Sequence, residues 1–268
     1  MRVIITGDLH YGLFKKGDYS THSMINTIKS LNPDVIGLCG DTFAENIDLL
    51  NKCLGLFDDF HGVKLLIAGN HDIWASYRYD SLTLYNEIIP AVADHHNFHY
   101  LDESPLIYNN TGFVGSIAWY DYSFRRMDLE IPMQAYREKS YNGFTWYDVM
   151  KIRWDLDDPA FTEYQYLKLN DHLAKISCNV DRIIVMTNHV PFRNMLAVKN
   201  DADWDFGNAF QGSEIFGHLL QQYKKVNYLV CGHAHLTGEY QNAHIKCYYI
   251  GSDYIKKGYV MLEIDNSA

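Results

Sequence analysis

The chain has 268 residues, a length that one α/β domain can fill around a single large core, so nothing in it calls for a second domain. It carries 23 Lys and Arg against 33 Asp and Glu, a formal charge of −10. This balance repels nucleic-acid backbones over any long face and disfavours extended non-specific binding to them. A small anionic substrate drawn in by local cations stays open.

The N-terminus, "MRVIITGDLH", reads as a short buried strand and lacks the pattern of a secretory signal. No apolar stretch is long enough to span a bilayer, so we expect a cytoplasmic protein with no membrane partner. The five cysteines are odd in number and show no C-x-x-C spacing, which favours buried free thiols. The acidic composition defines no subunit interface.

In chain order, short apolar runs alternate with helix-like segments. Strands are expected at 2–6, 34–39 and 64–69, with helices at 21–31 and 46–60 between them. This alternation indicates βαβ units and a parallel sheet. Later strands are expected at 113–119, 182–188, 226–232, 245–251 and 259–264, and the last of these follow one another too closely for helices, which predicts antiparallel pairing as well. The whole of 1–268 is predicted as one domain.

The segment 120–170 differs from the rest and is predicted to be a helical, aromatic-rich insertion. Residues 119–169 hold 13 of the 39 aromatic residues and three of the five tryptophans. These rings either bury a small core of their own or form a cap over a substrate pocket. In the second case Arg125 and Arg126 are candidate phosphate contacts. Trp204 and Asn208, in a Gly- and Asp-rich loop at 201–213, are further candidates for the edge of that pocket.

Polar residues follow five of the expected strands. They are Asp8 and His10, then Asp41, then "GNHD" at 69–72, then His189, then His233 and His235. Because ligands bind at the carboxyl ends of strands in open α/β sheets, these side chains are expected to converge. Oxygen and imidazole donors without thiolates suit Mn²⁺, Fe²⁺/Fe³⁺ or Zn²⁺. Two aspartates, one asparagine and four histidines are too many for one ion and fit a pair sharing a carboxylate.

The ordered set resembles the calcineurin-like metallophosphoesterase superfamily, whose signature is D-x-H, GD, GNH[DE], H and GHxH. Here the elements are "DLH" (8–10), "GD" (40–41), "GNHD" (69–72), His189 and "GHAH" (232–235). The resemblance implies a four-layer α/β/β/α sandwich with two mixed sheets. It also implies that one ion is held by Asp8, His10 and His235, that the other is held by Asn70, His189 and His233, and that Asp41 bridges both.

The resemblance leaves His71 free of metal and implies a protonated imidazole near the leaving group. Two cations lower the pKa of a bridging water, and the resulting hydroxide attacks a phosphoryl group in line with the leaving oxygen. His71 would then act as the general acid, and Asp72 would steady the turn. The expected activity is therefore hydrolysis of a small phosphomonoester or phosphodiester, including nucleotides.

Departures from subfamily patterns narrow this expectation. Protein Ser/Thr phosphatases of the superfamily read GDxxDRG, where this chain reads "GDTFAEN", with Ala44 at the place of their His-orienting Asp. This disfavours protein phosphatase activity and leaves Glu45 or Asp72 as candidates to orient His71. A metal-dependent nuclease is the main alternative, and a non-catalytic scaffold of the same fold is a further one. The histidine-rich "DHHNFH" (94–99) lacks ordered carboxylates and is expected to hold no metal.

Overall fold

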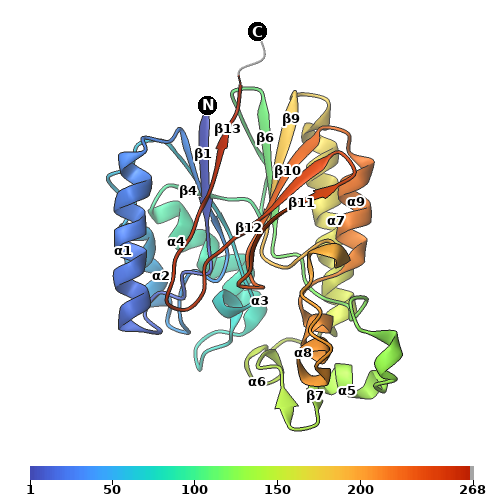
Figure 1. The fold of residues 1–268 in the computed structure, drawn as a ribbon. Helices are drawn as coiled ribbons and strands as arrows, with labels where there is room; N and C mark the ends of the chain where they lie inside the picture. The colour runs from blue at the N-terminus through green and yellow to red at the C-terminus, as the bar shows by residue number, and fades with distance from the viewer. Residues whose placement is uncertain (266–268) are drawn as a thin grey trace.

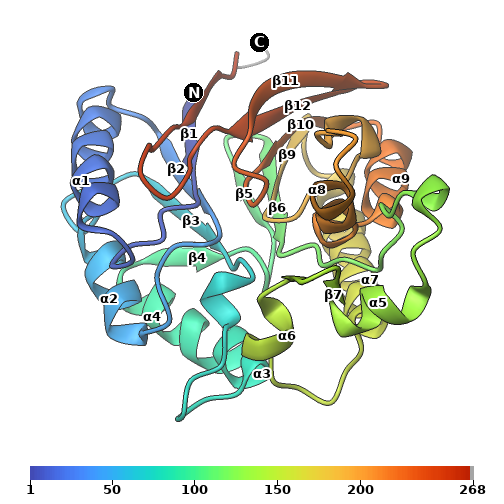
Figure 2. The ribbon, with the colours of Figure 1, turned by 60° about the horizontal axis from the view of Figure 1, so that its bottom comes forward.

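The computed structural model describes residues 1–265, which form two facing β-sheets with helices on both outer faces. Figure 1 shows the two sheets side by side, with α1 and α2 outside one and α7 and α9 outside the other. Figure 2, in which the bottom of Figure 1 comes forward, shows short elements on that side and the long helices along the two flanks of the sheets. The four-layer α/β/β/α architecture with two mixed sheets is thus confirmed.

The first sheet has five strands in the order β13-β1-β2-β3-β4. These are β13 (Val260–Glu263), β1 (Arg2–Thr6), β2 (Val35–Cys39), β3 (Val63–Ile67) and β4 (Phe98–Tyr100). The four strands β1 to β4 run parallel, and β13 pairs antiparallel with β1. The carboxyl ends of β1, β2 and β3 therefore meet at one edge, where the first three motifs begin.

The second sheet has six strands in the order β11-β12-β10-β9-β6-β5. These are β11 (Thr237–Asn242), β12 (Ile245–Ile250), β10 (Val226–Cys231), β9 (Arg182–Thr187), β6 (Thr111–Ser116) and β5 (Leu106–Tyr108). The strands β6, β9, β10 and β12 run parallel, and the edge strands β5 and β11 pair antiparallel with β6 and β12. The ends of β9 and β10 deliver the remaining two motifs.

Alternation along each strand divides the core into three parts. The apolar layer between the sheets includes Val3, Ile5, Val35, Ile67, Phe113, Ile184, Met186 and Val230. Their sequence neighbours face outward, as the period of two requires: Ile4, Ile36 and Leu38 under one helical layer, Ile183, Val185 and Leu229 under the other. The sheets approach closely at Gly115, where an added Cβ would lie 2.3 Å from the Ile67 side chain.

Helices cover both outer faces. The first sheet is covered by α1 (Lys15–Ser30), α2 (Ile47–Gly55) and α4 (Ile89–His95), and the second by α7 (Asp158–Ser177) and α9 (Glu214–Gln222). The short turns η1 (His71–Ile73), α3 (Ser81–Thr83), η2 (Leu84–Ile88) and η4 (Arg193–Met195) connect these elements. Side chains cap α2, α7 and α9, with Asn46, Asp157 and Ser213 accepting backbone N–H groups.

The segment predicted as an insertion contains short elements and a hairpin. They are η3 (Met127–Leu129), α5 (Met133–Glu138), β7 (Ser140–Tyr141), β8 (Phe144–Thr145) and α6 (Asp148–Lys151). The rings of Tyr136 and Trp146 stack against Phe206 of α8 (Ala202–Gly207) and Phe210 of η5 (Asn208–Phe210). The helix α7 begins within the predicted segment and contacts β6. The extent of a substrate cap stays a prediction.

Several boundaries differ from those expected. The helix expected at 21–31 begins at Lys15, and the one expected at 46–60 ends at Gly55. The edge strands β5 and β11 and the small hairpin have no counterpart among the expected strands. Four of the five thiols are buried, as expected, but Cys178 at the end of α7 is exposed. No helix within residues 1–265 is both long and apolar enough to cross a membrane.

Candidate metal centre

The candidate metal ligands lie at the carboxyl ends of strands from both sheets. Asp8 and His10 follow β1, Asp41 follows β2, Asn70 follows β3, His189 follows β9, and His233 and His235 follow β10. Six of the seven are buried, and His235 is partly exposed. The parallel register of the central strands brings them together, which is the geometric expectation from the sequence.

Five of these residues have left-handed backbone conformations. The φ angles of Asp8, His10, Asp41, His233 and His235 lie between 42° and 63°. This region is unfavourable for residues with a Cβ and gathers at functional sites, where the surrounding structure enforces it. The adjoining glycines are sterically required: a Cβ on Gly69 would lie 2.2 Å from Asp41 Oδ1, and one on Gly232 would lie 2.8 Å from Asp8 Oδ1.

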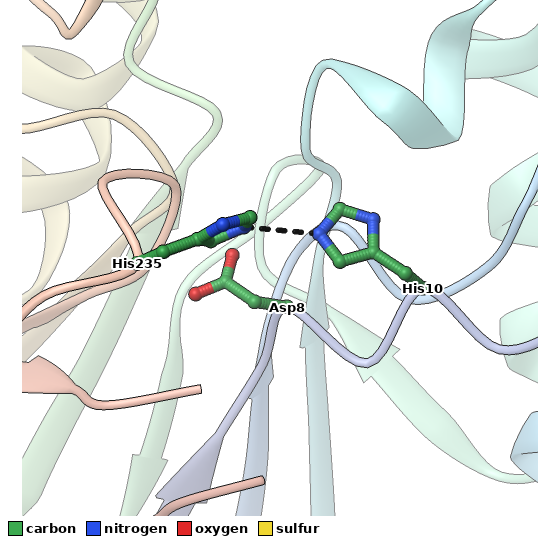
Figure 3. A group of neighbouring side chains, drawn as sticks. All are labelled: Asp8, His10 and His235. Atoms are coloured by element: carbon green, nitrogen blue, oxygen red, sulfur yellow. Dashed lines mark hydrogen bonds between the residues drawn. The ribbon is translucent and has the colours of Figure 1, made fainter. Parts of the chain in front are cut away.

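A first group of donors consists of Asp8, His10 and His235, whose ligand atoms lie within 4.8 Å of one another. Figure 3 shows the Asp8 carboxylate below the two imidazoles, which point toward each other. The two Nε2 atoms are 3.1 Å apart. Two atoms bound to one cation at about 2.1 Å lie roughly 3.0–3.4 Å apart for angles of 90–109°. The separation therefore fits a shared cation.

Burial favours the neutral forms of both His10 and Asp8 in this group. Burial lowers the pKa of His10 well below its ordinary value, so its imidazole is neutral and offers a lone pair. Burial also raises the pKa of Asp8, although its Oδ1 accepts the backbone N–H of His233 at 2.8 Å. A bound cation would remove the cost of that buried negative charge.

A second group contains Asn70, His189 and His233. The His189 Nδ1 donates to the carbonyl oxygen of Ile117 at 2.9 Å, which leaves Nε2 as a buried lone pair without a hydrogen-bond partner. This second bond to a backbone carbonyl is the usual arrangement of a metal-binding histidine. The His189 ring centroid lies 4.1 Å from that of His233. Both side chains are therefore placed to share an ion.

The neutral His233 ring faces oxygen on both sides. Its Nδ1 is 3.0 Å from Asn70 Oδ1 and 4.0 Å from Asp41 Oδ2, and its Nε2 is 3.3 Å from the Phe210 carbonyl oxygen. Burial lowers the pKa of His233 well below its ordinary value, so the ring carries one N–H for two acceptors. When Nε2–H points to Phe210, the Nδ1 and Asn70 lone pairs face each other. A cation between them satisfies both, so the donor set fits a metal ion.

Asp41 lies between the two groups. Its Oδ1 accepts the backbone N–H of His71 at 3.0 Å, while Oδ2 faces His233. Asp41 also forms a compact trio with His10 and His71. Burial, and then the nearby Asp72 and Asp8 carboxylates, raise the pKa of Asp41 well above its ordinary value. The Asp41 carboxylate thus lies near His10 of the first group and near His233 of the second.

His71 is half-buried at the start of η1, beside both groups. Its ring stacks on the Trp74 indole, with centroids 3.8 Å apart, and lies 4.5 Å from the His10 ring. Burial lowers the pKa of His71 to about 3, so the imidazole alone is neutral at pH 7. The protonated form expected from the sequence therefore requires added negative charge nearby, which a phosphate ester would bring.

Neither candidate expected to orient His71 contacts its imidazole. The Asp72 carboxylate accepts the backbone N–H groups of Thr42, Phe43 and Gly69 at 2.7, 3.2 and 2.8 Å, which ties the "GNHD" turn to the loop after β2. Glu45 pairs with Lys151 at 2.7 Å. Asp72 therefore forms its hydrogen bonds with the backbone of these two loops and not with the His71 ring.

The sequence reading missed several residues around the centre. Asp148 of the insertion accepts a hydrogen bond from Asn70 Nδ2 at 2.9 Å. The Tyr254 ring lies 4.7 Å from the rings of both His10 and His235, and Lys257 donates to the Asp8 carbonyl oxygen at 2.8 Å. No motif marks these positions. Only the density of aromatic residues near Asp148 was a signal.

A cavity of about 600 Å³ opens beside Trp74. Its wall includes the two arginines Arg78 and Arg153 and the rings of Tyr77 and Tyr79. Arg78 donates to the Tyr77 hydroxyl, and Arg153 donates to the Ser76 carbonyl oxygen. Among residues 1–265, no carboxylate lies within ion-pair distance of either guanidinium. The volume is in the range of small-molecule sites.

The residues expected from the sequence to contact substrate form hydrogen bonds and ion pairs with other protein groups. Arg126 pairs with Asp128 and with the buried Asp205, and Arg125 donates to the Tyr122 carbonyl oxygen. Trp204 donates to the Ala197 carbonyl oxygen and carries the Lys199 ammonium over its ring. Asn208 also donates to Ala197. Their role in binding substrate stays a prediction.

The histidine-rich stretch 94–99 forms ordinary polar contacts. His96 bonds Asp58 and Asn51 at 2.8 and 3.0 Å, and His99 bonds the Ser104 carbonyl oxygen at 2.8 Å. In the described part of the chain, the two candidate metal groups of three or more His, Cys, Asp or Glu side chains both lie at the strand ends, away from 94–99.

Comparison with solved structures gives relatives that share the fold. The chain is similar to the phosphopantetheinyl hydrolase PptH of Mycobacterium tuberculosis, with a TM-score of 0.75 and 14% identity over 94% of this chain and 89% of that one. A dimetal phosphatase of Danio rerio gives 0.61 and 11% over 97% and 91%. GAP50, the anchor in the inner membrane complex of Plasmodium, gives 0.53 and 13% over 94% and 71%.

Comparison by sequence reaches the same superfamily. None of the curated proteins compared with the chain matches it. The family model described as calcineurin-like phosphoesterase matches residues 1–236, which include all seven candidate ligands and His71. Together with the two facing sheets and the donors at their strand ends, this match shows that the chain belongs to the calcineurin-like phosphoesterase family.

Proposed function

We propose that the protein is a dimetal-dependent phosphoesterase that hydrolyses a small phosphomonoester or phosphodiester. The observation that carries the proposal is the buried His189 Nε2, which has no hydrogen-bond partner, beside the His233 ring and the Asn70 amide oxygen, which lies 3.0 Å from His233 Nδ1. Such an arrangement is stabilised by a cation. The net charge of −10 favours a small substrate over nucleic acid.

The donors divide into two sites in this proposal. Asp8, His10 and His235 hold one ion, and Asn70, His189 and His233 hold the other. Asp41, which lies near His10 and His233, would be the ligand shared by the two sites. When bound, a pair of Mn²⁺, Fe²⁺/Fe³⁺ or Zn²⁺ ions supplies charge that polarises a phosphoryl group and lowers the pKa of water.

His71 serves as the proton donor to the leaving oxygen. Its half-buried ring is stacked on Trp74 and lies beside His10, one of the candidate ligands. A phosphate ester bound there brings negative charge, which raises the pKa of the imidazole above its low resting value and favours the imidazolium. Proton donation then stabilises an alkoxide leaving group.

In this proposal the cavity beside Trp74 holds the part of the substrate that extends away from the ester at the metal centre. Arg78 and Arg153 offer donors to a second anionic group, and the tyrosine rings offer apolar faces. A phosphorylated metabolite with a second negative charge or a ring fits this chemistry. Because the Mycobacterium tuberculosis hydrolase shares the fold, a phosphopantetheinyl ester belongs in the test panel.

The experiment is a panel of esters assayed with Mn²⁺, Fe²⁺ and Zn²⁺ separately: nitrophenyl phosphate, bis-nitrophenyl phosphate, nucleotides, a phosphopantetheinyl ester and single-stranded DNA and RNA. We expect metal-dependent turnover of a small ester. Preferred cleavage of the nucleic acids would replace the proposal with a nuclease. The same metal binding without any turnover would indicate a scaffold.

The His71→Ala variant tests the proton donor, with His95→Ala, an exposed histidine of the same type, as its control. We expect His71→Ala to keep both metals and to lose about 10²- to 10⁴-fold in kcat for phenyl phosphate, with a smaller loss for nitrophenyl phosphate, which needs no proton. Full activity of His71→Ala on phenyl phosphate would remove the assignment.

A further inference from the structure

The Asp148 carboxylate lies at the start of α6 in the insertion and is 1% exposed. It accepts four side-chain hydrogen bonds, two on each oxygen. Oδ1 receives Asn70 Nδ2 at 2.9 Å and Trp74 Nε1 at 2.7 Å, and Oδ2 receives the Tyr120 hydroxyl at 2.9 Å and Trp146 Nε1 at 2.8 Å. Four donors fill the lone-pair capacity of a carboxylate. A neutral amide at this position has one oxygen and cannot accept all four.

One of these bonds fixes the orientation of a candidate metal ligand. An asparagine amide presents either oxygen or nitrogen to a neighbour, and only the oxygen ligates a cation. Because Asn70 Nδ2 donates to Asp148, Oδ1 is the atom that faces His233. An amide rotated by 180° would direct N–H groups at the ion and its oxygen at a carboxylate.

A second hydrogen bond of Asp148 holds Trp74, whose indole stacks on His71. The indole Nε1–H is held by Asp148, and the indole face stacks on the imidazole at 3.8 Å with an angle of 28° between the rings. No side chain of residues 1–265 forms a hydrogen bond to the His71 ring nitrogens, so stacking on Trp74 and packing against His10 set its plane. The hydrogen bond of Asp148 therefore influences the plane of the His71 ring through the Trp74 indole.

We propose that Asp148 is a positioning residue that holds the Asn70 oxygen toward the metal position and the Trp74 indole against His71. Ala44 stands where the protein Ser/Thr phosphatases of the superfamily have the Asp that orients their histidine. In this proposal Asp148, from the insertion, orients His71 instead, through the Trp74 indole. The inference rests on the proposed function for its effect on turnover. Its effect on metal binding can be measured without any substrate.

The test compares Asp148→Ala, which removes both acceptor oxygens, with Tyr120→Phe, which removes one hydrogen bond from the same carboxylate but leaves those to Asn70 and Trp74 in place. Calorimetric titration of metal-free protein with Mn²⁺ measures the effect of losing the bond to Asn70. We expect Asp148→Ala to weaken one of two sites by about 10- to 100-fold, the range for partners that orient ligands. Tyr120→Phe should stay within about twofold of the parent. Equal Mn²⁺ affinities for Asp148→Ala and the parent would overturn the proposal.

The dependence of kcat on the leaving group measures the effect of losing the bond to Trp74. Asp148→Ala should lose more kcat on phenyl phosphate than on nitrophenyl phosphate, whereas Tyr120→Phe should change both alike. Trp74→Phe keeps a stacking ring, loses the bond to Asp148, and should show the same selective loss at unchanged Mn²⁺ affinity. Should Asp148→Ala fail to fold by circular dichroism, Trp74→Phe decides the question, and an equal loss on both esters there would refute the proposal. If the parent binds Mn²⁺ but hydrolyses no ester, the proposed phosphoesterase function is wrong. The Mn²⁺ titration still tests the positioning role of Asp148 in that case.

Discussion

The buried pair of Lys139 and Asp158 allows a direct test of how the insertion is anchored. Lys139 Nζ lies 2.6 Å from Asp158 Oδ2, and the same carboxylate accepts Trp119 Nε1 at 2.8 Å and the Tyr122 hydroxyl. Trp119 in turn packs against the His189 ring. Lys139→Met keeps the length of the side chain and removes its charge, which leaves a buried carboxylate without its cation.

The chain provides a matched control. Lys175 and Asp171 form a pair with the same residue types and the same 2.6 Å separation, but their side chains are 60% and 57% exposed, against 11% and 6% for Lys139 and Asp158. Distance is thus held constant and burial varies. Exposed helical pairs contribute about 0.3–0.5 kcal/mol, whereas removing one partner of a buried pair costs about 3–5 kcal/mol.

Water reaches the buried pair from one side, because both residues line a cavity of about 420 Å³. We therefore expect Lys139→Met to cost about 3 kcal/mol, the lower end of that range. At a urea slope of about 3 kcal/mol per M, the unfolding midpoint falls by about 1 M. Lys175→Met should move it by less than about 0.2 M. Urea titrations followed by circular dichroism at equal metal concentration measure both, and equal midpoint shifts would refute the reasoning.

Three further predictions concern metal, pH and substrate. Mn²⁺ at 100 times its dissociation constant should raise the free energy of unfolding by about 2.7 kcal/mol, seen as a higher Tm that EDTA reverses; an unchanged Tm would count against a site in the folded chain. Burial lowers the pKa of His172 to about 4, so below about pH 6.5 the unfolded chain binds a proton at this residue more tightly than the folded chain does. In urea titrations the parent should therefore lose more stability than His172→Gln between pH 7 and pH 4. Equal losses would contradict this. Arg78→Gln should raise KM about tenfold with little change in kcat, whereas the same effect in Arg125→Gln would restore the contact expected from the sequence.

The sheets and the convergence of the motifs could be predicted because each step is local. A buried strand has its own apolar run, and parallel strands place whatever follows them at one edge. Asp8, Asp41 and His233 come together for this reason. The missed edge strand β11 alternates exposed and half-buried residues in the polar sequence "TGEYQN", so it lacks an apolar signal.

The supporting contacts could not be predicted because they join distant segments without a repeating pattern. Asn70 and Asp148 are 78 positions apart, and their hydrogen bond depends on how the insertion folds back over the strand ends. Likewise, the sequence around Arg126 gives no sign of its ion pair with Asp205, which lies 79 positions away. Burial, which lowers the pKa of His71 to about 3, also follows from tertiary packing and not from the motif.

The most direct test of the central claim is the metal content of the purified protein. After loading with Mn²⁺ and removal of free ions, elemental analysis should find two ions per chain in the parent. Asp41→Asn, which alters the carboxylate between the two donor groups, should fall well below two while remaining folded by circular dichroism. One ion or none in the parent, or two in Asp41→Asn, would contradict the paired site.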